Sequence, residues 1–181
     1  MAAGAGAALG NALAQSQTTH PNIVLILADD LGWGDVGYQG SEIHTPNIDR
    51  LAAEGVRFTQ CHVYPLCSPT RSGLMTGRSP MRFGLIYTVV RPWANHGIPL
   101  DEHLMPQTFR AAGYQTAACG KWHLGHGNRK LMPNARGFDH FYGHMNGDID
   151  WHVPVMSQMQ SGSDIPQKWH IAPPWPHAPA L

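Results

Sequence analysis

The sequence predicts an α/β fold, in which a mostly parallel sheet carries helices on both faces. The run Asn-Ile-Val-Leu-Ile-Leu at residues 22–27 is almost wholly apolar and stops at Asp29 and Asp30, as a strand buried on both faces does. Beyond it, helical and extended patterns alternate along the chain. Such alternation favours parallel strands joined by helices, with ligands bound beyond the carboxyl ends of the strands.

The first predicted helix spans residues 46–54. Thr45 offers a cap, Pro46 fits the first turn because no N–H is needed there, and Gly55 ends the helix. Residues 56–59 then alternate between apolar and polar side chains, which indicates a second strand.

A second helix is predicted to begin at Cys67-Ser68-Pro69-Thr70-Arg71. Pro69 suits its first turn, so that Ser68 or Cys67 would be the cap. The N–H groups and the positive dipole end of such a turn favour an anion, and Arg71 adds planar, bidentate donors. The pattern indicates a site for an oxyanion such as sulfate or phosphate. The alternative is a buried cysteine followed by a short surface helix.

A third helix is predicted over residues 104–112, with a proline in its first turn and a glycine after its end, and a strand over 115–119 follows. The chain then reads Gly-Lys-Trp-His-Leu-Gly from residue 120. Lys121 and His123 lie two residues apart, so on an extended strand they face the same side and can reach one ligand. The alternative is a core strand centred on the tryptophan, with an exposed lysine.

Asp29 and Asp30 stand at a predicted strand exit, as Lys121 and His123 do. Adjacent carboxylates repel one another unless a cation or hydrogen-bond donors compensate their charge. Oxygen-only ligands suit the hard ions Ca²⁺ and Mg²⁺ rather than zinc. The two aspartates therefore predict a divalent metal, and an ordinary polar turn is the alternative.

Composition limits the classes of partner. The 181 residues contain 12 Lys plus Arg and 12 Asp plus Glu, so no net charge draws the chain to nucleic acid or to an anionic membrane. No apolar stretch approaches the roughly 20 residues of a membrane-spanning helix. The cysteines predict no disulfide framework, and a zinc site around Cys61, His62 and Cys67 would lack a fourth ligand.

Three parts of the chain differ in composition. Residues 1–19 begin small, apolar and uncharged, with an Ala-Leu-Ala sequence of the form that a signal peptidase cleaves, and are expected to be the remnant of an export signal or a disordered leader. Residues 20–152 carry the elements above, and residues 153–181 have the composition of an irregular, proline-rich tail. An export signal predicts a periplasmic or secreted protein.

The run at residues 67–71, with Leu-Met-Thr-Gly-Arg at 74–78, resembles the signature of the type I sulfatases, which belong to the alkaline-phosphatase superfamily. The resemblance implies a sulfatase-like α/β fold. It also implies that a formylglycine-generating enzyme oxidises Cys67 to formylglycine, whose hydrate supplies the nucleophile. Asp29, Asp30 and this formylglycine would then share a divalent ion, Ca²⁺ or alternatively Mg²⁺.

The same resemblance assigns roles to cationic side chains. Lys121 and His123, in a Gly-Lys-Trp-His-Leu-Gly motif like that of the family, would bind the sulfate oxygens and assist proton transfer. Arg71 would hold the hydrate and offset charge in the transition state. His177, within Pro-His-Ala-Pro, resembles a further substrate-binding histidine of the family, although no apolar strand precedes it.

The resemblance runs from Pro21 to about Asp150, is closest to arylsulfatases of the B type, and covers only the N-terminal part of such an enzyme. Family members supply a second, Asp-Asn pair to the metal, and no Asp-Asn dipeptide occurs in this sequence. We therefore expect an arylsulfatase-like sulfuric ester hydrolase, truncated and with weak or no activity, for a small sulfate ester or a sulfated saccharide. The alternatives are a metal-dependent phosphatase or phosphodiesterase of the same superfamily, which would use an encoded Ser or Thr, and a non-catalytic binding remnant.

Overall fold

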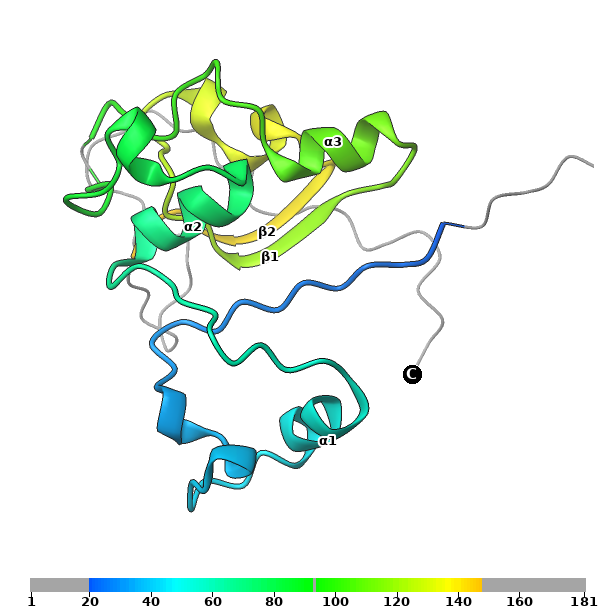
Figure 1. Cartoon of the computed structure of the whole chain (residues 1–181). Coiled ribbons are helices and arrows are strands. Elements are labelled where there is room, and N and C mark those ends of the chain that lie inside the picture. The colour runs from blue at the N-terminus through cyan, green and yellow to red at the C-terminus, as the bar shows by residue number, and fades with distance from the viewer. Residues whose placement is uncertain (1–19, 93, 148–181) are drawn as a thin grey trace, which may run out of the picture. The chain divides into compact units, whose positions relative to one another are not determined.

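The computed structural model of the chain describes residues 20–92 and 94–147 (Figure 1). The chain divides into two compact units, Met1–Glu54 and Gly55–Leu181. The two aspartates predicted to bind metal belong to the first unit. The other candidate residues that the structure describes belong to the second.

Helix α1 (Pro46–Glu54), in the first unit, confirms the first predicted helix. Two short 3-10 helices precede it, Trp33–Asp35 and Gly37–Gln39. The Asp49 carboxylate accepts hydrogen bonds from the backbone N–H of Tyr38 and from the hydroxyl of Thr45, both at 2.9 Å. The start of α1 is thereby tied to the second 3-10 helix.

The predicted strands at residues 22–27 and 56–59 are wrong. Neither range forms a strand (Figure 1). Both expose large apolar side chains, such as Val24 at 83% and Phe58 at 81%. A strand needs a neighbour that pairs with its backbone, and neither range has such a neighbour within the described residues. Their composition is that of buried strands, but pairing depends on tertiary context that an apolar run does not supply.

The regular elements of the second unit confirm the rest of the predicted order. They are helix α2 (Cys67–Thr76), helix α3 (Met105–Ala111), strand β1 (Ala117–Lys121) and strand β2 (His140–His144). Short 3-10 helices lie at Pro80–Phe83, Arg129–Leu131 and Pro133–Arg136. Among the described residues, no helix combines the length and apolar content needed to cross a bilayer.

Strands β1 and β2 pair in parallel, with Ala117 opposite His140 and Lys121 opposite His144 (Figure 1). Parallel pairing requires a long crossover between the strands, which here runs through 3-10 helices, and it agrees with the predicted α/β class. Strand β2 was not predicted. Its sequence His-Phe-Tyr-Gly-His has little alternation and contains a glycine, which weakens the strand signal.

The hydrophobic core of the second unit gathers around the segment that leaves β1. Its buried members are Leu85, Val90, Ala94, Ile98, Leu104, Trp122, Leu124 and Phe138. The Trp122 ring meets Phe138 edge to face, with centroids 6.2 Å apart, and its indole N–H donates to the carbonyls of Gly125 and Leu131 at 3.1 Å. A fully buried side chain of this size contributes about 1.5–3 kcal/mol. Trp122 thus anchors the backbone between the two predicted site residues that flank it.

Candidate active site

Cys67 is the first residue of α2 and is partly buried. Leu66 takes the cap position, with an extended backbone at φ −132° and ψ 151°, so the expectation that Ser68 or Cys67 caps the helix is wrong. Pro69 still removes no intrahelical hydrogen bond, because the first such bond runs from the Thr70 N–H to the Leu66 carbonyl at 3.2 Å. Cys67 therefore lies in the first turn, at the positive end of the helix dipole, as predicted.

Lys121, the last residue of β1, contacts Cys67. Its ammonium nitrogen lies 3.1 Å from the Cys67 sulfur, although the two residues are 54 positions apart in sequence. The ammonium group adds a full positive charge to the partial charge of the helix terminus. The structure thus brings together two residues that the sequence assigned to one site, and their combined field favours an anion.

Arg71 belongs to the same group of side chains. It lies one helical turn after Cys67 and is 9% exposed. One guanidinium nitrogen, Nη1, donates to the carbonyl oxygen of Lys121 at 2.6 Å. A buried guanidinium is costly unless it is hydrogen-bonded, so this bond both compensates the charge and ties α2 to the end of β1.

His123 is buried, at 5% exposure, but it does not continue the strand. Strand β1 ends at Lys121, and His123 has a left-handed backbone with φ +57°. The argument that strand alternation places Lys121 and His123 on the same side is therefore wrong. Left-handed backbone is uncommon in residues other than glycine and costs about 1–3 kcal/mol, although histidine adopts it more often than most; it clusters at active sites, where surrounding contacts enforce it.

Gly147, which lies beside the His123 ring, and Asn146, which precedes it in the chain, were not predicted as site residues. A β-carbon at Gly147 would lie 2.7 Å from Cε1 of the His123 ring, so only glycine lets the backbone pass this close to the imidazole. The side-chain oxygen of Asn146 is buried and has no hydrogen-bond partner within the described residues. Asn146 is thus a candidate contact for a ligand that donates a hydrogen bond. The Asn-Gly pair signalled a turn, but nothing in the sequence linked it to His123.

Asp29 and Asp30 lie in a bend of the first unit, and both are exposed. Asp30 has a left-handed backbone with φ +57°, a conformation that aspartate tolerates in turns. Two adjacent, exposed carboxylates form an oxygen-only donor set, which fits a hard divalent ion. The same geometry fits the polar turn that was the alternative, so the metal assignment stays a prediction.

The remaining candidates contribute less. His177 lies outside the described residues. The alternative zinc site gains no support, because Cys61 is exposed and the His62 ring hydrogen-bonds Gln60 at 3.1 Å. Within the described ranges, no group of three potential metal ligands includes either residue.

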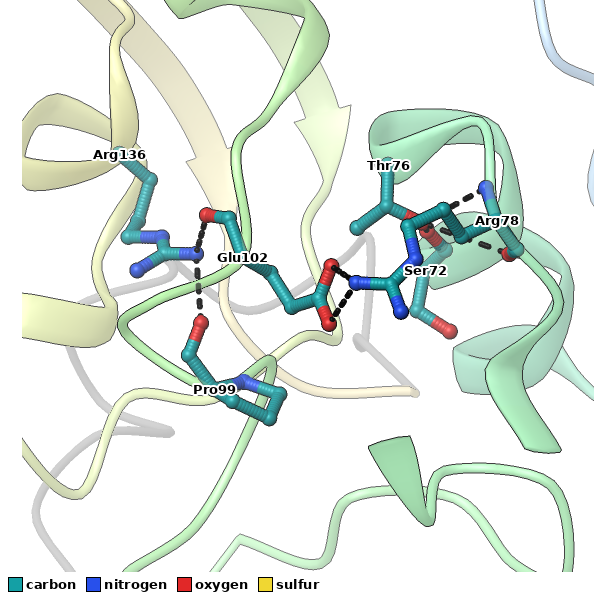
Figure 2. Close-up of polar contacts among 6 residues, drawn as sticks. All are labelled: Ser72, Thr76, Arg78, Pro99, Glu102 and Arg136. Atoms are coloured by element: carbon teal, nitrogen blue, oxygen red, sulfur yellow. Dashed lines mark hydrogen bonds and ion pairs between the residues drawn. The ribbon is translucent and has the colours of Figure 1, made fainter. Parts of the chain in front are cut away.

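The far end of α2 is anchored by a charged network (Figure 2). Arg78, just beyond the helix, donates from Nη1 to both carboxylate oxygens of Glu102, at 2.5 and 2.7 Å, and Glu102 is only 8% exposed. Arg136 donates from Nη2 to the carbonyls of Glu102 and Pro99, at 3.0 and 2.9 Å. Burial lowers the pKa of Arg136, and the nearby acidic charges, Glu102 among them, oppose that shift. Arg78 therefore has a structural role within the 74–78 motif.

Comparison with known proteins gives the family. The sulfatase family profile matches residues 21–162. Arylsulfatase J of Mus musculus is 45% identical over 136 residues, which cover 75% of this chain and 23% of that protein. Human (Homo sapiens) arylsulfatase A is 48% identical over 126 residues, covering 68% of this chain and 25% of that protein. The chain thus spans about a quarter of the length of these relatives.

Solved structures agree with the sequence matches. Ps i-CgsB has a TM-score of 0.67 and 45% identity, over 70% of this chain and 28% of that one. The PsFucS1 sulfatase from Pseudoalteromonas sp. has a TM-score of 0.58 and 40% identity, over 67% of this chain and 25% of that one. These similarities confirm the predicted α/β class with a parallel sheet, of which this structure holds an incomplete form. The chain belongs to the sulfatase family and corresponds to the N-terminal part of its members.

Proposed function

We propose that this chain carries the nucleophile side of a sulfuric ester hydrolase of the arylsulfatase type. The contact between the Lys121 ammonium group and the Cys67 sulfur is the observation that carries the proposal. In a converted protein, the β-carbon of residue 67 would bear oxygen in place of this sulfur. The sulfur therefore stands in for the reacting oxygen, and a fixed cation lies within hydrogen-bond reach of it.

Formylglycine at position 67, once hydrated, supplies two hydroxyl groups on one carbon, the first to attack sulfur and the second to release sulfate afterwards. The residues around it bind and orient. The ammonium group of Lys121 binds a sulfate oxygen and offsets the negative charge of the group in the transition state. Arg71, fixed against the Lys121 carbonyl, adds a second positive charge at the base of the site. Removing one such donor from an enzyme commonly lowers the rate by about 10²–10³.

His123 is the group in this site that suits proton transfer. Near pH 7 a neutral imidazole accepts a proton and the resulting imidazolium returns it, whereas ammonium and guanidinium groups stay protonated. We assign His123 a proton transfer, either to the departing alcohol or from the nucleophilic hydroxyl. Its burial and its enforced backbone support a fixed orientation toward one ligand.

We also propose that Asp29, Asp30 and residue 67 hold a divalent metal, Ca²⁺ or alternatively Mg²⁺. Sulfatases in general use formylglycine with a divalent metal, and the exposed oxygen donors of the first unit suit such an ion. The metal would lower the pKa of a bound hydroxyl and offset negative charge. Calorimetric titration with Ca²⁺ tests the assignment without turnover: Asp30→Asn should weaken binding at least tenfold, while Asp35→Asn should not. Equal affinity of wild type and Asp30→Asn would refute it.

The substrate class follows from the family and is proposed in the same terms. A sulfated saccharide or another small sulfate ester fits an anion site at a helix terminus, and one structural neighbour was solved with k-i-k-neocarrahexaose. His177 is proposed as a further substrate contact. Since the matched segment covers only about a quarter of each relative, we propose weak or no turnover by this segment alone. The proposed organisation is a leader at residues 1–19, a catalytic segment at 20–152 and a tail at 153–181, in a periplasmic or secreted protein.

The hydrolase proposal is tested with the chain produced alongside a formylglycine-generating enzyme. Excess protein is incubated with an aryl sulfate or an aryl phosphate, with Ca²⁺ or with a chelator, so that a single turnover is detectable. We expect release of phenol from the sulfate, lost in Cys67→Ala and in Lys121→Met. Preference for the phosphate would favour a phosphatase or phosphodiesterase. Absence of any release, in protein shown to carry formylglycine at residue 67, would favour a non-catalytic binding remnant over a hydrolase.

A further inference from the structure

Ser68, between Cys67 and Pro69, is fully buried, and its hydroxyl makes two hydrogen bonds to distant backbone. It donates to the carbonyl oxygen of His123 at 2.7 Å and accepts from the backbone N–H of Val90 at 3.0 Å. Both contacts cross the unit, since Ser68 lies 55 positions from His123 and 22 from Val90. The hydroxyl thus uses its single donor and one of its acceptor lone pairs for tertiary contacts.

A serine near a helix start ordinarily caps the helix, and Ser68 does not. Leu66 is the cap residue, without a side-chain hydrogen bond. Ser72, in the same helix and equally buried, satisfies its hydroxyl locally by donating to the Pro69 carbonyl at 3.0 Å. A buried serine in α2 therefore need not reach beyond the helix. Ser68 does so, and its partner is the backbone of His123.

The partner is a residue whose backbone must be held. His123 is left-handed at φ +57°, a conformation that relaxes unless contacts on both sides fix it. Its N–H donates to the Met145 carbonyl at 3.0 Å, and its carbonyl accepts from Ser68. With both peptide groups fixed, the direction in which the imidazole leaves the backbone is fixed too.

Helix α2 holds the neighbouring carbonyl in the same way. Arg71 donates to the carbonyl oxygen of Lys121, so two side chains of the first turns of α2 hold the backbone on either side of Trp122. The helix that begins at Cys67 therefore also holds the backbone of Lys121 and of His123. Lys121 completes the group by reaching back to Cys67.

We propose that Ser68 is a positioning residue, whose hydroxyl fixes the left-handed backbone of His123 and thereby the direction in which its imidazole leaves the backbone. The role of the imidazole in proton transfer rests on the proposed function, whereas the positioning by Ser68 does not. Loss of the hydroxyl leaves two buried backbone groups without their partner, one of them the carbonyl of His123.

The test follows the imidazole directly, in the full chain with its unconverted cysteine. The Cε1–H resonance of His123 is recorded by NMR with labelled histidine and assigned with His123→Gln. We expect this resonance to move in Ser68→Ala and to keep its position in Ser72→Ala, which removes an equally buried hydroxyl from the same helix. Amide exchange of Val90 should accelerate at least tenfold in Ser68→Ala alone.

Ile98 serves as the reference for folding, because its N–H bonds the Leu124 carbonyl at 3.0 Å without involving Ser68. If Ser68→Ala also loses protection at Ile98, the pair Ser68→Thr and Ser68→Val replaces it, since these differ only by hydroxyl against methyl. The threonine variant should retain the wild-type resonance and the valine variant should not. An unchanged resonance in Ser68→Ala or Ser68→Val, or an equal change in Ser72→Ala, would overturn the proposal. The readout needs no turnover, so its failure is distinct from failure of the hydrolase proposal.

Discussion

The ion pair between Arg78 and Glu102 allows a test of how α2 is held in place. The perturbation is a double-mutant cycle of Arg78→Met, Glu102→Gln and the double variant. Glu102 is 8% exposed and accepts from one guanidinium nitrogen through both oxygens, whereas the side chain of Arg78 is 48% exposed. The pair is therefore intermediate between a surface and a buried ion pair.

The magnitude follows from that intermediate burial. Hydrogen bonds to charged groups contribute about 1.5–3 kcal/mol, and breaking a fully buried pair costs about 3–5 kcal/mol. Because solvent screens the exposed half of Arg78, we expect a loss of about 1–3 kcal/mol for Arg78→Met. The coupling energy between the two substitutions should be about 1–2 kcal/mol, since each removes the same contact.

The assay is urea unfolding followed by circular dichroism, with Arg110→Met as the matched control. Arg110 pairs with Asp139 at 3.1 Å, but both side chains are substantially exposed, at 50% and 28%. That control should cost less than about 1 kcal/mol. Additive effects of the Arg78 and Glu102 substitutions, or a loss in Arg110→Met as large as in Arg78→Met, would refute the reasoning.

Two further changes probe the site and its surroundings. Gly147→Ala should displace the His123 ring and lower the free energy of unfolding by about 1–3 kcal/mol through overpacking, because the new β-carbon would lie 2.7 Å from Cε1. The control is Gly34→Ala, whose β-carbon meets nothing within 4 Å. Urea unfolding compares the two variants, and an equal loss of stability in both would contradict the close approach at Gly147. Burial lowers the pKa of His126, so its contribution to stability is complete above the unfolded value of about 6.5 and is lost as the pH falls toward the lower folded value. The free energy of unfolding should therefore fall less between pH 7 and pH 5 in His126→Gln than in wild type. If it falls equally in both proteins, His126 does not contribute to the pH dependence of stability.

The sequence predicted local structure where single residues decide it. Pro46 and Gly55 bracketed α1, and the pattern of residues 67–71 placed a helix start within one or two residues of its position. Cys67 and Arg71 were assigned to one site because a cation at a helix terminus suits an anion, and the resemblance to sulfatases added Lys121.

Features that depend on tertiary contacts were not predictable in this way. The left-handed backbone of His123 arises from hydrogen bonds to segments that are distant in sequence, and no local pattern signals it. Ser68 was one of two predicted caps, whereas the carbonyl to which it donates lies 55 positions away, beyond the reach of any local pattern. The apolar runs at 22–27 and 56–59 suggested strands, yet strand pairing depends on neighbours rather than on composition.

The central claim is that Cys67 is the site of the sulfatase nucleophile. Mass spectrometry of the peptide that contains Cys67 tests it most directly, after production of the full chain with a formylglycine-generating enzyme and beside a known sulfatase as a positive control. The account predicts loss of the thiol and gain of an aldehyde oxygen at residue 67, with Cys61 and Cys119 unmodified. An intact thiol at residue 67, in cells that convert the control sulfatase, would contradict it.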